Sequence, residues 1–132
     1  MEGSLKELAG YRLARAKEML AASESNLEIG QYKTSLNRSY YAVFHAMRSA
    51  NALKKFDSSK HSGVIAFFTK EYLKTEILER NLAAVIKESS LCREKSDYDD
   101  FHVAGREEAE EQLKNAKYLV QKIEEYVNAV NE

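Results

Sequence analysis

Apolar residues recur every three or four positions along most of the chain, which is the spacing of one face of an α-helix. The pattern predicts helices over about residues 4–27, 32–53, 58–74, 79–96 and 105–130. Ser4 and Glu7 have the spacing of a capping box for the first helix, and Ser58 or Ser59 can cap the third. Gly30 and the polar turn at 55–59 separate the first three helices, and residues 97–102 are expected to form a loop.

Composition and length agree with a helical protein. The chain contains no proline and only five glycines, so few residues interrupt a helix. Long helices joined by short connections favour antiparallel neighbours. We therefore expect an all-α fold, an up-and-down antiparallel four-helix bundle with an additional short helix, formed as a single domain over residues 1–132. A domain of this length needs no disulfide, which agrees with the single cysteine, Cys92.

Several functional classes are excluded by what the sequence lacks. No apolar run reaches the roughly 20 residues of a membrane-spanning helix, and the N-terminal residues do not resemble a secretory signal. We expect a cytoplasmic protein without a membrane association. Three histidines and one cysteine match no zinc spacing, and no glycine-rich phosphate loop, nucleophile elbow or dinucleotide fingerprint occurs. No metal and no cofactor are expected.

The helix predicted over residues 32–53 has two distinct faces when its residues are placed at 100° intervals. The apolar face carries Leu36, Tyr40, Val43 and Met47. The polar face carries Arg38, Tyr41, His45 and Arg48. Arginines beside a phenol and an imidazole can bind a phosphate, and the imidazole titrates near neutral pH, where it can transfer a proton. A solvated face that happens to include a histidine is the alternative interpretation.

The formal net charge of −1 conceals an uneven distribution. Residues 29–56 contain five lysines and arginines and no acid, whereas residues 94–111 contain eight acids. A basic face favours an anionic partner. RNA, a nucleotide and the acidic segment of a neighbouring subunit all fit this description, and charge does not distinguish among them.

Arg93 falls on the apolar stripe of its predicted helix, together with Leu82 and Ile86. A buried arginine needs a partner, and Asp97, four residues later, would form a structural ion pair with it if the helix continues that far. Alternatively, Arg93 points into a cleft shared with Arg38 and His45, with Tyr98 at the edge. His61 precedes Ser62 and Gly63 near a helix start, where it either binds an anion or serves as a cap.

Three sequence blocks resemble the HEPN superfamily. They are Asn37-Arg38-Ser39-Tyr40-Tyr41-Ala42-Val43-Phe44-His45-Ala46, Ser59-Lys60-His61-Ser62-Gly63, and Arg93-Glu94-Lys95-Ser96-Asp97-Tyr98-Asp99-Asp100-Phe101. They look like the small stand-alone proteins of that superfamily, and the resemblance covers nearly the whole chain. It implies a helical bundle that is usually dimeric and often acts beside a minimal nucleotidyltransferase as a toxin and antitoxin pair. Many members are metal-independent endoribonucleases.

The nuclease motif of those enzymes is an arginine, a short variable segment and a histidine, usually near the fourth helix. Arg93 matches the arginine, but Asp97 and Tyr98 follow where the histidine is expected. The same spacing occurs in the second helix at Arg38 and His45. The resemblance therefore implies the fold and only part of the nuclease site.

Two functional hypotheses follow. In the first, His45 takes the proton of a ribose 2′-hydroxyl, Arg38 or Arg93 stabilises the charge on the phosphorus oxygens, and Tyr41 orients the phosphate or donates a proton. The remaining anion-binding candidates are Arg48, His61 and Tyr98, and a two-fold homodimer would bring two such stripes together. In the second, the chain is a non-catalytic helical interaction module that binds a protein partner or a nucleotide.

Overall fold

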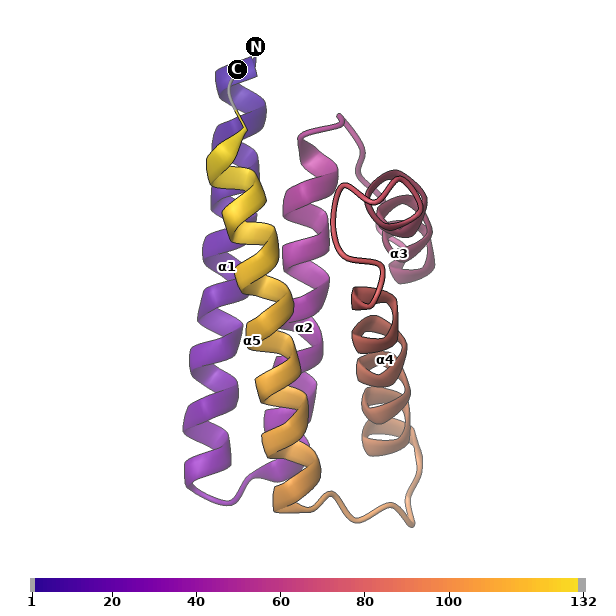
Figure 1. Cartoon of the computed structure of the whole chain (residues 1–132). Coiled ribbons are helices and arrows are strands. Elements are labelled where there is room, and N and C mark those ends of the chain that lie inside the picture. The colour runs from indigo at the N-terminus through magenta and orange to yellow at the C-terminus, as the bar shows by residue number, and fades with distance from the viewer. Residues whose placement is uncertain (1, 131–132) are drawn as a thin grey trace.

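The computed structural model describes residues 2–130, which contain five α-helices, one π-helical turn and no strand. The elements are α1 (Glu2–Glu28), α2 (Tyr32–Ala52), α3 (His61–Phe68), η1 (Thr69–Leu73), α4 (Leu82–Tyr98) and α5 (Arg106–Ala129). The predicted all-α fold is confirmed. The four long helices alternate in direction, and the short α3 lies across one end beside α4 (Figure 1).

Helix α2 is the centre of the bundle. It contacts α1, α3, α4 and α5, and α5 packs against both α1 and α2. In Figure 1, α5 lies in front of the α1–α2 pair, while α4 flanks α2 on the side away from α1. The apolar face of α2 is therefore covered, and its polar face lies along the seams with α1 and α4.

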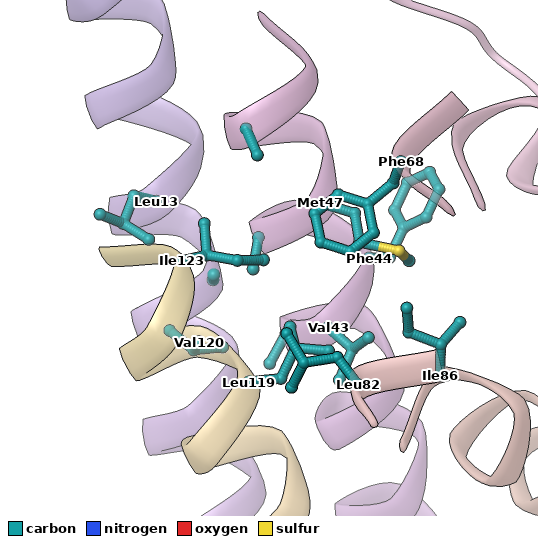
Figure 2. Packing of buried hydrophobic residues seen from close by; sticks show 14 of the residues in the cluster. Leu13, Val43, Phe44, Met47, Phe68, Leu82, Ile86, Leu119, Val120 and Ile123 are labelled. Atoms are coloured by element: carbon teal, nitrogen blue, oxygen red, sulfur yellow. The ribbon is translucent and has the colours of Figure 1, made fainter. Parts of the chain in front are cut away.

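The core is built around the apolar face of α2. Val43 and Met47 are almost completely buried, and they pack with Leu82 from α4 and with Leu119 and Ile123 from α5 (Figure 2). Each large aliphatic side chain buried in this way contributes about 1.5–3 kcal/mol of transfer free energy. The core anchors the inward face of α2 and leaves its polar residues directed outward.

The seam between α1 and α2 is made of small residues, which lets the two helices approach closely. Ala9, Ala16 and Ser23 recur every seven residues on α1 and are fully buried. The Ser23 hydroxyl lies 2.8 Å from the Oγ of Ser39 and donates to the Ser35 carbonyl at 2.8 Å. This close approach allows polar side chains at the rim of α1 to reach those of α2.

The predicted starts of the first and third helices were wrong. Helix α1 begins at Glu2, so Ser4 lies inside it and forms no capping box with Glu7. Helix α3 begins at His61 with Lys60 at the N-cap, because the Ser58 hydroxyl accepts the Lys60 amide (3.1 Å) and forms a turn before the helix. Ser59 does not cap it either.

The fourth helix is displaced toward the C-terminus relative to its prediction. Helix α4 begins at Leu82 and continues to Tyr98, so the expected loop at 97–102 begins only at Asp99. A side-chain ion pair one turn apart, between Arg93 and Asp97, accompanies this extension. As a result, Asp97 and Tyr98 lie on the same helix as Arg93.

Candidate functional site

An open hollow lies along the seam between α1 and α2. It has a volume of about 410 Å³ and is lined by Arg15 and Met19 from α1 and by Arg38, Tyr41 and His45 from α2. Three of the four residues on the predicted polar face of α2 thus line the same hollow. The α1 residues are additions that the sequence did not indicate.

His45 is half-buried and lies close to several arginines. Burial lowers the pKa of its imidazole, and the positive charges of Arg15, Arg48 and Arg12 lower it further. The ring lies beside Tyr41, with 6.3 Å between ring centroids, and beside Phe44, with 5.7 Å. At neutral pH the imidazole is therefore uncharged and can accept a proton.

Arg38 is the most available cation of the hollow. Its guanidinium donates to the side-chain oxygen of Asn37 at 3.1 Å, and it has no carboxylate partner among residues 4–130, whose side chains the structure describes. Arg15 is paired with Glu18 at 2.9 Å, but both side chains are exposed to solvent. An exposed pair of this kind is weak, so both arginines can bind an anion that enters the hollow.

Arg93 lies behind Tyr41 and does not line the hollow. Its Nε donates to Asp97 at 3.1 Å, and its Nη2 donates to the hydroxyls of Tyr41 at 3.4 Å and Tyr98 at 3.3 Å. The guanidinium also lies 5.0 Å from the centroid of the Tyr40 ring. The structure thus joins Arg93 to the site through the phenol of Tyr41, while the exposed Tyr98 stands at the outer edge.

A hydrogen-bond chain links α4 back to the hollow. The Asn37 amide nitrogen donates to Asp97 at 3.2 Å, on the same carboxylate oxygen that accepts from Arg93. The oxygen of the Asn37 side chain accepts from Arg38. Both Arg38 and Tyr41 are therefore held by residues that depend on the C-terminal turns of α4.

Arg48 is directed to the other end of the seam, away from the hollow. Its guanidinium donates to both carboxylate oxygens of Asp57, at 3.0 and 3.2 Å, and Arg12 from α1 donates to the same carboxylate at 3.1 Å. Arg12 also donates to the Arg48 carbonyl at 3.4 Å. Although burial alone would raise it, the pKa of Asp57 is lowered by its hydrogen bonds to Arg48 and to the Ser58 amide, and by the charge of Arg12.

His61, at the start of α3, belongs to an aromatic cluster on the α3 and α4 side of Tyr41. Its Nδ1 lies 2.9 Å from the Tyr40 hydroxyl, and its ring lies 4.3 Å from that of Phe44 between centroids. Burial lowers the pKa of its imidazole, with a further contribution from the positive charge of Arg93. The centroid of the His61 ring lies 5.8 Å from that of Tyr41. His61 and His45 therefore both lie beside the rings of Tyr41 and Phe44.

Neither a metal-binding cluster nor a membrane-spanning helix occurs in the described part of the chain. No group of three or more histidine, cysteine, aspartate and glutamate side chains within residues 4–130 is arranged to hold a metal ion. None of the helices formed by these residues is both long enough and apolar enough to span a membrane.

Four residues of the site were missed from the sequence: Arg12, Arg15, Asn37 and Asp57. The spacing of Arg12 and Arg15 by three residues was a signal that they share a face of the first helix. Nothing in the sequence indicated that this face borders the polar face of the second helix. Asp57 was placed only in a polar turn, and its reach back to α2 depends on how that turn folds.

Comparison with known proteins identifies relatives over almost the entire chain. The profile of the HEPN domain matches residues 9–126. The protein named "Putative toxin MJ0142" from Methanocaldococcus jannaschii is 31% identical over 119 residues, which are 90% of this chain and 81% of that protein. A UPF0332 protein from Thermotoga maritima is 27% identical over 125 residues, which are 95% of this chain and 89% of that protein.

The fold also has a counterpart among solved structures. The crystal structure of TT1696 from Thermus thermophilus matches with a TM-score of 0.75, and the match covers 89% of this chain and 96% of that one. The two sequences are 22% identical. The likeness therefore concerns the arrangement of the helices.

Proposed function

The chain belongs to the HEPN domain family, and we propose that it is a toxin that binds RNA and cleaves it without a metal ion. One observation carries the proposal. The hollow between α1 and α2 combines an uncharged imidazole, that of His45, with a guanidinium that has no carboxylate partner among the described residues, that of Arg38. A proton acceptor and an unpaired cation that line the same hollow are the minimum that metal-free cleavage of RNA requires.

The chemistry follows from these side chains. A scissile phosphate binds to Arg38, and His45 accepts the proton of the adjacent 2′-hydroxyl. The 2′-oxygen then attacks the phosphorus, the bond to the 5′-oxygen breaks, and a 2′,3′-cyclic phosphate remains. Arg38 stabilises the negative charge that develops on the phosphorus oxygens. The departing oxygen takes up a proton, and we assign the Tyr41 hydroxyl as its donor.

Arg93 acts through Tyr41 in this proposal. Its guanidinium is occupied by Asp97 and by two phenolic oxygens, so it orients the Tyr41 hydroxyl and does not itself bind the phosphate. This assignment differs from the usual nuclease motif of the superfamily, in which the arginine near the fourth helix works directly with a histidine. Arg93 is accordingly a positioning residue.

The experiment compares single variants of the purified protein on a labelled single-stranded RNA. We expect His45→Ala to slow cleavage by about 10²–10⁴-fold, because the proton acceptor is lost. Arg38→Ala should slow it by about 10²–10³-fold, because the charge of the transition state is no longer stabilised. A chelator should not change the rate, and the products should carry 2′,3′-cyclic phosphate ends.

Arg80→Ala is the matched control, because Arg80 is an exposed arginine just before α4, away from the hollow. Its rate should equal that of the wild type. The proposal is wrong if the wild-type protein leaves RNA intact, or if the His45 variant cleaves at the wild-type rate.

The cellular setting of the proposal is a two-gene system. A relative carries a toxin name, and the resemblance to stand-alone HEPN proteins implies a homodimer and a minimal nucleotidyltransferase as partner. Expression of the chain alone should then arrest growth, and His45→Ala should relieve the arrest. A nucleotidyltransferase encoded beside it should suppress the arrest when the two are expressed together.

A second candidate function is a non-catalytic interaction module, and one observation favours it. Phe101 and Val103, in the connection between α4 and α5, are 94% and 87% exposed, and Tyr98 beside them is 68% exposed. Exposed apolar residues of this size are typical of protein interfaces. If interaction is the function, Phe101→Ser should abolish partner binding, while RNA remains intact with every variant.

A further inference from the structure

We propose that the anion-binding surface continues beyond the hollow along the α1–α2 seam, as a track that takes consecutive phosphates of a single RNA strand. The inference rests on the proposed function, in which the hollow binds an RNA phosphate, and it adds the length of the bound strand. It also makes α1 one side of the binding site. The track consists of Arg38, Arg15 with His45, and the Arg12–Arg48 pair.

The directions of the two helices place these residues in one line. Helices α1 and α2 run in opposite directions, so the path from Met19 through Arg15 to Arg12 on α1 accompanies the path from Tyr41 through His45 to Arg48 on α2. Met19, Arg15, Tyr41 and His45 line the hollow. Arg12 touches the backbone of Arg48 one turn farther on.

The row of cationic side chains is longer than the surface that a single bound phosphate can contact. Arg38 and Arg48 are ten residues apart on α2, which corresponds to about 15 Å along a helix at 1.5 Å per residue. Arg15 and His45 lie between these two ends. Three cationic positions in a row fit a short stretch of a phosphate backbone better than one isolated anion.

The balance of charge along the track also favours a polyanion. Its four arginines face two carboxylates of this chain, Glu18 and Asp57. Burial and the neighbouring arginines keep His45 uncharged, so the positive charge belongs to guanidinium groups, which bind phosphate oxygens in a bidentate manner. The positive charge that these carboxylates do not neutralise is available to bind an anionic ligand.

Asp57 occupies the far end of the track, where its carboxylate takes the place that a phosphate would fill. It accepts from two guanidinium groups at 3.0–3.3 Å, and arginine binds phosphate oxygens through the same kind of charge-assisted hydrogen bond. Its side chain is 54% exposed, whereas that of Arg12 is only 11% exposed. The two arginines are therefore fixed in place, and an incoming phosphate competes with Asp57 for them.

The experiment measures binding as a function of the length of the ligand. The probes are 2′-O-methyl oligonucleotides of one to six residues, which cannot be cleaved through the 2′-oxygen, each titrated at several salt concentrations. We expect affinity to rise by about a hundredfold between one and three phosphates and then to level off. The slope of log K against log salt should approach about −2, since each phosphate bound from a single strand contributes about −0.7.

Two substitutions that each remove one negative charge distinguish binding along the track from a general electrostatic effect. Asp57→Asn keeps a hydrogen-bond acceptor for Arg12 and Arg48 and removes the competing charge. It should bind the three-residue and longer probes about tenfold more tightly, with mononucleotide binding unchanged. Asp100→Asn makes the same charge change on an exposed loop residue of the α4–α5 connection and should have no effect. Thermal unfolding of both variants reports whether the fold is intact.

The outcomes separate a failure of the track from a failure of the proposed function. If no oligonucleotide binds at any length, the proposed function itself fails. If a mononucleotide binds as tightly as a trinucleotide, or if the Asp57 and Asp100 variants behave alike, the track does not exist and only the hollow remains.

Discussion

At the scale of single residues, Tyr41 connects the hollow to the α4 residues that hold its side chain in position. Its ring lines the hollow beside His45, and its hydroxyl accepts a hydrogen bond from Arg93, which also donates to Asp97. A phenol held in this way loses less freedom when a ligand binds, because its position is already determined. The partly buried charge of Arg93 thus contributes to the site without lining the hollow.

The lowered pKa of His45 predicts how stability depends on pH. The unfolded chain binds the imidazole proton with an ordinary pKa near 6.5, whereas burial and the charges of Arg15, Arg48 and Arg12 lower the pKa in the folded state. The contribution of His45 to stability is therefore complete above the unfolded pKa and is lost as the pH falls from there through the lower pKa of the folded state. We expect the melting temperature of the wild type to drop as the pH falls below about 6.5, and His45→Gln to flatten that drop.

Thermal unfolding of both proteins across this pH range checks the prediction. Some dependence should remain in the variant, because the pKa of His61 is lowered as well, by burial and by Arg93. Identical pH profiles for the variant and the wild type would show that the surroundings of His45 differ from those described.

At the scale of the elements, the turn between α2 and α3 both contacts the arginines of α1 and α2 and determines where α3 begins. Asp57 reaches back to Arg12 and Arg48, and Ser58 accepts the Lys60 amide so that α3 can begin at His61. Because His61 then contacts Tyr40 and Phe44, the turn determines where α3 meets the polar face of α2. A change in this turn should affect both the stability of the protein and the geometry around Tyr41.

Gly63 tests how closely α3 packs against that turn. A methyl group at this position would lie 2.7 Å from the Ser58 hydroxyl oxygen and 3.3 Å from its Cβ. We expect Gly63→Ala to lower the free energy of unfolding by about 1–3 kcal/mol, because Ser58 must move and its bond to Lys60 is lost. Chemical denaturation measures the change, and a Ser58→Gly, Gly63→Ala double variant should recover part of it.

Gly10 supplies the control for the same substitution. It lies inside α1 with nothing within 4 Å of an added methyl group. Gly10→Ala should therefore raise the free energy of unfolding by about 0.5–1 kcal/mol, the usual difference between glycine and alanine in a helix. If both alanine variants were stabilised, the close contact at Ser58 would not exist.

At the scale of the whole molecule, burial is uneven across the bundle. Helices α2 and α5 bury apolar residues along their whole lengths, whereas the fully buried apolar residues of α1 lie between Ala9 and Ala16. In α4, Leu82 and Ile86 are buried near the start, but Ser89 and Ser96 are the only buried residues farther on. The half of α4 that carries Arg93 and Asp97 is thus held mainly by polar contacts with α2.

Hydrogen exchange should reveal this difference. We expect the amides of residues 90–98 to exchange faster than those of α2 and α5, because opening this segment exposes little apolar surface. Asp97→Asn should increase their exchange further, because it removes the charge that pairs with Arg93 and accepts from Asn37. Exchange in residues 90–98 as slow as in α2 would contradict the prediction.

Local patterns determined much of the fold. The number and approximate positions of the helices follow from apolar spacing and the scarcity of helix breakers, both of which act over a few residues. The two faces of α2 could be separated by angle alone, because Arg38, Tyr41 and His45 lie on one rigid helix. The helix ends were less accurate, since Ser58 and Asp97 take part in contacts that only the folded turn and the neighbouring helix define.

Tertiary structure alone decided how the site is completed. Arg12 and Arg15 reach the polar face of α2 because small residues bring α1 close in one particular axial register. Arg93 stands behind Tyr41, and Asp57 returns to Arg48, because α4 and the α2–α3 turn pack where they do. The spacing of residues within one helix does not encode the register of its neighbours. That register arises from the packing of the whole core, which is why the sequence alone indicated the α2 side of the hollow and not its α1 side.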